Sequence, residues 1–150
     1  MINHKKQGKK NKRMGADFER RVRKDLEEKG WIVSKWQNNL KYSKEKEDFK
    51  CIPAKPGRFR MMQTGFPDFF VYKMYDEEEN FLDTGAIPKT RPIKIFKIIF
   101  VECKTNGYLS KEEKEKAQWY LKNNYCEEFL IAKKIKNGRK VGVKYAVFER

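Results

Sequence analysis

The stretch IFKIIFVECK, from Ile95 to Lys104, is the most strand-like segment of the chain. Its apolar residues are mostly β-branched or aromatic, and Gly107 follows soon after, which is typical of a buried strand that ends at a turn. A second run, FPDFFVYK from Phe66 to Lys73, is nearly continuously apolar. Both runs therefore predict interior strands of a sheet that is covered on its two faces.

Two amphipathic patterns predict helices. The first covers residues 15–29, where Phe18, Val22 and Leu26 recur at a spacing of four and form one apolar stripe. The second covers residues 110–124 and starts with an S-x-x-E capping box. Its expected inner face contains Ala117, Tyr120 and Leu121.

The remaining pattern completes one domain, as the length of 150 residues also suggests. Two segments exceed a minimal core: residues 37–64 are expected to be irregular, and residues 76–94 to form an extended hairpin or loop. The order is helix, three strands, helix, two strands, which predicts an α/β fold. Beyond the two runs above, strands are expected at residues 31–36, 128–134 and 141–148.

The chain is strongly basic, with 36 Lys and Arg against 21 Asp and Glu and a net charge of +15. Such an excess favours a polyanionic partner, because cationic side chains gain affinity when phosphates release their counterions. Three scattered cysteines without metal-ligand spacing are typical of a reducing, intracellular compartment. No apolar window is long enough to span a membrane, and no secretion signal is visible. The single histidine, His4, excludes nucleophile systems and nucleases that need an imidazole base.

Two basic segments are candidates for contacting a phosphate backbone. Residues 1–14 carry only cationic charges without apolar periodicity, so we expect a flexible arm that lies along DNA or only keeps the protein soluble. In the irregular segment, cations alternate with aromatic residues and methionines, which suits a nucleic-acid contact but also a peripheral strand with a solvated face. The candidate DNA-binding residues are Lys9, Lys10, Lys12 and Arg13 in the first segment, and Lys50, Lys55, Arg58 and Arg60 in the second.

Two carboxylates and a lysine lie at the ends of the two apolar runs. Glu102 and Lys104 project from the same face, since side chains alternate along a strand, and Asp68 could lie beside Glu102. With the Cys103 carbonyl, these oxygens form half of the shell that Mg²⁺ takes, and Mn²⁺ is expected to substitute. A cation held there lowers the pKa of a bound water and neutralises phosphate charge, while Lys104 positions or deprotonates that water. The sequence therefore predicts hydrolysis of phosphodiester bonds.

The E-x-K spacing alone is weak support, because the same spacing recurs elsewhere in this charged chain. Only Glu102 follows a run of four apolar residues, and Pro67-Asp68 is the only Pro-Asp pair. The alternative is a strand-end ion pair between Glu102 and Lys104 with a turn-forming Asp68. We favour catalysis. Burying charges at the end of the most apolar strand costs free energy, and a catalytic role would explain why this cost is tolerated.

With these motifs in order, the chain resembles the PD-(D/E)xK nuclease superfamily, and within it archaeal Holliday junction resolvases and VRR-NUC nucleases. The resemblance covers about residues 15–135 and implies an αβββαβ core with a mixed sheet flanked by helices. It also implies Mg²⁺- or Mn²⁺-dependent phosphodiester hydrolysis. The pieces that carry it are GADFE at residues 15–19, GFPD at 65–68, VECK at 101–104 and LSKEEK at 109–114.

The resemblance further implies roles for individual residues. For Glu19 the alternative is a surface pair with Arg23, and for Gln118 it is a solvated helix face. Resolvase-like members act as dimers, so a homodimer is expected. The implied roles are metal ligands at Asp68 and Glu102, the catalytic lysine at Lys104, a helper carboxylate that reaches the metal through water at Glu19, and a polar helper at Gln118.

The function that we expect is that of a Mg²⁺-dependent DNA endonuclease, selective for branched or otherwise non-B-form DNA such as four-way junctions or flaps. The gap between Asp68 and Glu102 is longer than in compact resolvases, so the segment 76–94 is expected to be an insertion. This difference weakens a specific assignment to the resolution of four-way junctions. Two alternatives stay open: a site-specific duplex endonuclease, and a non-catalytic basic module that binds nucleic acid.

Overall fold

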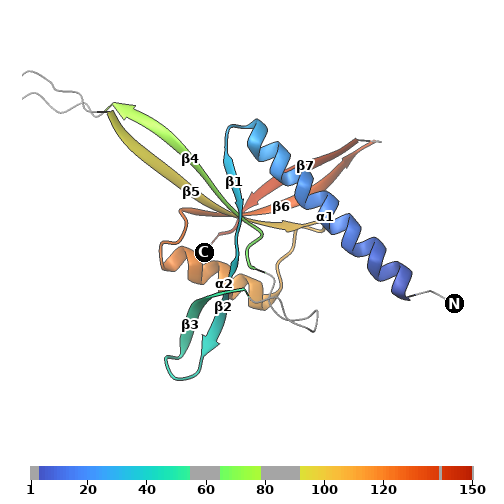
Figure 1. The fold of residues 1–150 in the computed structure, drawn as a ribbon, viewed down its shortest axis with the longest axis horizontal. Coiled ribbons are helices and arrows are strands. Elements are labelled where there is room, and N and C mark those ends of the chain that lie inside the picture. Colours follow the sequence, from blue (N-terminus) through green and yellow to red (C-terminus); the bar gives the residue numbers. More distant parts are fainter. Residues whose placement is uncertain (1–3, 55–64, 79–91, 139, 150) are drawn as a thin grey trace, which may run out of the picture.

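The computed structural model describes residues 4–54, 65–78, 92–138 and 140–149. These residues form two helices and seven strands, which Figure 1 shows as a ribbon. The helices are α1 (His4–Glu28) and α2 (Lys111–Lys122). The strands are β1 (Ile32–Lys35), β2 (Asn38–Ser43), β3 (Asp48–Pro53), β4 (Phe69–Glu78), β5 (Pro92–Lys104), β6 (Glu128–Asn137) and β7 (Lys140–Val147).

Five of the strands form one sheet in the order β1-β4-β5-β6-β7. β5 and β6 run parallel, whereas the other neighbouring pairs are antiparallel. A parallel pair needs a crossover connection, and α2 provides it here. The expectation of an α/β fold is confirmed in this form: a mixed central sheet with two helices.

The sheet buries a core on each face, because the side chains of β5 alternate between the two. Ile99 and Val101 pack in one core with the apolar stripe of α1. Phe100 packs in the other core with the inner face of α2. Both helix faces contain the residues that the sequence pattern predicts: Phe18, Val22 and Leu26 in α1, and Ala117, Tyr120 and Leu121 in α2.

The first helix begins at His4 and not at Gly15, so residues 4–14, where we expected a flexible arm, are helical. These residues have no apolar stripe, but Lys, Arg and Gln are good helix formers. Once residues 15–28 are fixed against the sheet, the helix can extend at low cost, since only its nucleation is expensive. Within the described residues, no helix combines the length and the apolar character that crossing a bilayer requires.

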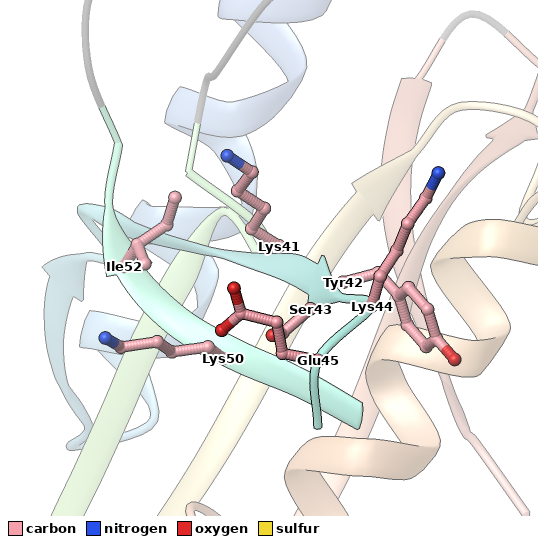
Figure 2. A pocket seen from close by; sticks show the side chains of 7 residues that line it. All are labelled: Lys41, Tyr42, Ser43, Lys44, Glu45, Lys50 and Ile52. Atoms are coloured by element: carbon pink, nitrogen blue, oxygen red, sulfur yellow. The ribbon is translucent and has the colours of Figure 1, made fainter. Parts of the chain in front are cut away.

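The segment 37–64 was expected to be irregular, but its first part is the two-stranded hairpin β2–β3. The pattern was missed because one face of the hairpin is charged and its buried face is short. Leu40 and Cys51 pair on that buried face, and they pack with the α2 core. The outward face borders a hollow of about 500 Å³ (Figure 2).

The long connection between Asp68 and Glu102 is mostly strand. β4 and β5 pair from Phe69 opposite Val101 to Glu78 opposite Pro92, as an extended hairpin requires. Residues 79–91, which join the two strands, lie outside the described part of the chain. The peptide bond between Phe66 and Pro67, which precede Asp68, is cis.

Candidate active site

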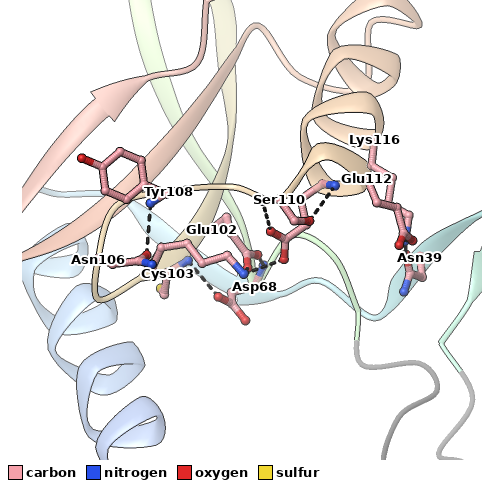
Figure 3. A network of polar contacts seen from close by, with 11 residues as sticks. Asn39, Asp68, Glu102, Cys103, Asn106, Tyr108, Ser110, Glu112 and Lys116 are labelled. Atoms are coloured by element: carbon pink, nitrogen blue, oxygen red, sulfur yellow. Dashed lines mark hydrogen bonds and ion pairs between the residues drawn. The ribbon is translucent and has the colours of Figure 1, made fainter.

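The two predicted carboxylates meet at the end of the β4–β5 pair (Figure 3). Since Phe69 pairs with Val101, Asp68 lies opposite Glu102 one step further along. The Asp68 N–H donates to Glu102 Oε2 at 3.1 Å, and the Cys103 N–H donates to Asp68 Oδ2 at 2.8 Å. Each side chain is thus fixed by the backbone of the other strand, which sets the distance between the acids.

Lys104 lies on the same face as Glu102, as the alternation along a strand predicts. Its Nζ is 3.1 Å from Glu102 Oε1 and 2.5 Å from Glu113 Oε1. Glu113 is the capping-box residue of α2: Glu113 Oε2 accepts from the Ser110 N–H at 2.8 Å. The capping motif was visible in the sequence, but nothing in it showed that the second oxygen of Glu113 would hold Lys104.

Glu19 belongs to the same network through a lysine that the sequence did not single out. Lys35, at the end of β1, forms a short ion pair with Glu19 of α1, and its Nζ lies 3.9 Å from Asp68 Oδ1. The alternative partner of Glu19, Arg23, instead lies over the Phe69 ring at 5.5 Å from its centroid. The only sequence signal for Lys35 was its position at the end of a predicted strand.

Burial and the negative charge of a neighbouring carboxylate push both acids toward their neutral forms. Among the described residues Glu102 is the only buried charged side chain, at 6% exposed. Burial, and after it the negative charge of Asp68, raises the pKa of Glu102 to about 8. Burial also raises the pKa of Asp68, although the Cys103 N–H and Lys35 favour its charged form. The pair therefore lacks enough positive charge to ionise fully at neutral pH.

The lysine behaves in the opposite way. Burial works to lower the pKa of Lys104, but its bonds to Glu113 and Glu102 outweigh burial and leave the pKa above its ordinary value. Lys104 is therefore a firmly held ammonium in this arrangement. Such a group suits the stabilisation of negative charge better than the removal of a proton.

The donor set fits a hard divalent cation, which typically takes one or two carboxylates and completes its shell with water and phosphate oxygens. Within the described residues, no three His, Cys, Asp or Glu side chains converge in a group that could hold a metal ion. The Cys103 thiol is no substitute, because burial and the charge of Asp68 raise its pKa and keep it neutral. Asp68, Glu102 and the Cys103 carbonyl stay the candidate ligands.

The other predicted residues lie apart from this network. Gln118 is exposed on α2, and the hydrogen bonds that join Asp68, Glu102, Lys104 and Glu113 do not include it. Lys9, Lys10, Lys12 and Arg13 are exposed along the N-terminal half of α1, and Lys50 is exposed on β3. The remaining candidates, Lys55, Arg58 and Arg60, lie outside the described residues.

Fold and site together define a mixed-sheet α/β protein with a buried carboxylate pair and an ion-paired lysine at one end of its central strands. No protein-family model, no curated protein and no solved structure matches the chain. The function is therefore argued from the chemistry of this site.

Proposed function

We propose that this chain is a divalent-cation-dependent endonuclease that hydrolyses phosphodiester bonds in DNA. One observation carries the proposal: Asp68 and Glu102 are interlocked through the backbone bonds of 3.1 and 2.8 Å, with Lys104 at 3.1 Å, in a protein of net charge +15. Close carboxylates suit a cation, and the basic surface suits a polyanionic substrate.

The order of elements supports an assignment to the PD-(D/E)xK nucleases. Without the β2–β3 hairpin, the chain runs α1, β1, β4, β5, α2, β6, which is the αβββαβ order of that core. Asp68 precedes the second of these three strands, and Glu102 and Lys104 end the third. The hairpin and the β4–β5 extension are then additions to the core.

Each residue has a distinct task in the proposed reaction. Asp68, Glu102 and the Cys103 carbonyl would hold Mg²⁺ or Mn²⁺. Bound there, the cation supplies a water of lowered pKa and positive charge for the phosphate oxygens. Lys104, held by Glu113, stabilises negative charge as it develops on phosphate. Glu19 acts through Lys35, which it holds 3.9 Å from Asp68 Oδ1.

The proposed substrate is branched or otherwise non-B-form DNA, which is recognised through its backbone and shape. Cationic side chains lie next to the site: Arg20, Arg23 and Lys35, together with Glu19, line a hollow of about 230 Å³. Phosphates on either side of the cleaved bond could occupy such a space. A homodimer, as in resolvase-like enzymes, is part of the same proposal.

A cleavage assay tests the proposal. Supercoiled plasmid, a four-way junction, a flap and a linear duplex are incubated with Mg²⁺, Mn²⁺ or EDTA. We expect nicking or cutting only with a cation, faster on the branched substrates than on the linear duplex. A non-catalytic binding module predicts no cutting of any substrate, and a site-specific enzyme predicts discrete duplex fragments.

A matched pair of substitutions assigns any cleavage to this site. Asp68→Asn should abolish cleavage but keep DNA binding. Asp25→Asn makes the same chemical change on α1, where Asp25 bonds to Lys29 and Tyr145, and should leave cleavage intact. Cleavage by the Asp68→Asn variant in Mg²⁺ would remove Asp68 from the mechanism.

A further inference from the structure

We infer that the β2–β3 hairpin is a DNA-binding arm that contacts the phosphate backbone of the duplex flanking the cleaved bond. The inference rests on the proposed function, since it takes DNA as the partner. It adds a surface to that function: the outward face of the hairpin, built around Lys41 and Lys50, which lie directly opposite each other in the two strands.

The two faces of the hairpin differ in chemistry. On the inner face, Leu40 is buried, and the rings of Tyr42 and Phe49 meet edge to face at 5.6 Å. On the outer face Lys41 and Lys50 are both exposed, and they border the hollow of about 500 Å³ together with Lys44 (Figure 2). The buried side chain of Leu40 thus fixes the inner face, while the side chains of Lys41 and Lys50 stay exposed on the outer face.

The charges on the outer face do not help the hairpin to fold. Like charges directly opposite in an antiparallel pair destabilise it. Within the described residues neither Lys41 nor Lys50 forms an ion pair. Three lysines border the hollow, and Glu45 is the single acidic residue that borders it. An unbalanced cationic pair of this kind gains most from a polyanion, because its phosphates replace the missing counter-charge.

The hairpin is fixed directly to the segment that carries Asp68. The Phe66 N–H donates to the Asn38 carbonyl at 2.9 Å, and the Trp36 N–H donates to the Asp68 carbonyl at 3.1 Å. The backbones at Gly65 and Trp36 are in such close contact that a Cβ on Gly65 would lie 2.2 Å from the Trp36 carbonyl oxygen. The base of the hairpin and the candidate metal ligand are therefore held as one unit.

Helix α2 holds the hairpin at both ends, at Asp48 next to the turn and at Asn39 near the base. Trp119 Nε1 donates to Asp48 Oδ1 at 2.9 Å, and Lys116 Nζ donates to Asn39 Oδ1 at 3.2 Å. The same helix carries Glu113, which holds Lys104. Both attachments fix the position of the outer face relative to the catalytic groups.

The dimensions of the hairpin suit a duplex. Six residues per strand span about 20 Å at about 3.3 Å per residue, and this length corresponds to about six base pairs of DNA axis at 3.4 Å each. A two-stranded ribbon also fits the width of the major groove. The hairpin is thus long enough to hold a duplex arm several base pairs away from the site.

The salt dependence of binding tests the inference. Fluorescence anisotropy of a labelled junction is measured in EDTA, so that binding does not depend on cleavage. With Lys41→Ala/Lys50→Ala, we expect the slope of log K against log salt, where K is the association constant, to become less negative by about 1.8, because each phosphate contact contributes about −0.9. At 0.1 M salt this corresponds to about an eightfold loss of affinity per contact.

Two matched variants separate a binding role from a general loss of charge or folding. Lys140→Ala/Lys144→Ala removes the same charge from exposed positions on β7 and should bind as wild type. Lys41→Arg/Lys50→Arg keeps both charges and should keep the wild-type slope. An equal loss in either control variant overturns the inference.

The outcomes also separate this inference from the nuclease proposal. If wild type cleaves DNA but the alanine pair binds with unchanged affinity and slope, the hairpin arm is wrong and the nuclease stands. If wild type cleaves none of the substrates but the alanine pair loses affinity as expected, the hairpin surface stands and the nuclease is wrong.

Discussion

Replacing Asp68 with Asn should stabilise the protein while destroying its response to cations. Burial and the charge of Asp68 raise the pKa of Glu102 from its ordinary 4.5 to about 8. At pH 7 the folded state therefore keeps a proton that the unfolded chain has released. One pKa unit corresponds to about 1.36 kcal/mol, so the raised pKa of Glu102 lowers the free energy of unfolding at pH 7 by about 3 kcal/mol.

The sign follows from which state binds more protons. Because the folded-state pKa of Glu102 lies above the unfolded one, stability is lost as the pH rises from about 4.5 to about 8. Burial is the larger cause and the charge of Asp68 the second, so Asp68→Asn should recover the smaller part of this cost of about 3 kcal/mol at pH 7. The variant should also lose less stability than wild type between pH 5 and pH 8, in urea unfolding with EDTA.

Addition of Mg²⁺ should reverse the ranking. A ligand that binds only the folded state stabilises it by about 2.7 kcal/mol at 100 times its Kd. We expect wild type and the Asp25→Asn control to gain stability with Mg²⁺, and Asp68→Asn to gain little. If Asp68→Asn is instead less stable than wild type in EDTA and Mg²⁺ still stabilises it, the carboxylate pair is structural and Asp68 is not a ligand of the cation.

Three further predictions concern the groups around the pair. Lys104→Ala should lower the cleavage rate by about 10²-fold or more, with Mg²⁺-dependent stability retained; in Lys104→Arg an acidic limb of the pH–rate profile shifted from wild type would indicate a base instead. Glu113→Gln should cost about 1 kcal/mol or less by urea unfolding and should slow cleavage, because Gln can still close the capping box but loses the charge that pairs with Lys104; Glu112→Gln, at a position that pairs with Lys116, is the control, and equal rates in both would show that Lys104 needs no support. Added DNA should increase the helical circular dichroism signal, because phosphates offset repulsion among the cations of residues 4–14; an increase that persists after deletion of residues 1–14 would contradict this.

The sequence predicted the elements that are held together by apolar periodicity. β5 could be predicted because a continuous apolar run of this length is typical of a buried strand. The helices α1 and α2 could be predicted because their apolar residues repeat at helical spacing. The alternation along β5 also placed Glu102 and Lys104 on one face. These features depend on neighbours in the sequence, which a single chain displays directly.

The features that were missed depend on contacts between distant segments. Lys35 gains its position from α1 and from the Asp68 segment, neither of which is near it in sequence. Leu40 of the β2–β3 hairpin is buried against the α2 core, about seventy residues further on. The helix over residues 4–14 continues a neighbouring element and has no apolar pattern of its own.

The balance of charge around Glu102 argues for a cation more strongly than the motif does. The network contains four acids, Glu19, Asp68, Glu102 and Glu113, against two lysines, Lys35 and Lys104, so it carries a charge of −2 when all six are ionised. The hydrogen bonds of the site are complete, because every buried side-chain polar atom among the described residues has a partner. What is missing is positive charge, although the whole chain carries a net charge of +15. A structural ion pair would need one acid for each lysine, whereas the two surplus negative charges equal the charge of one divalent cation.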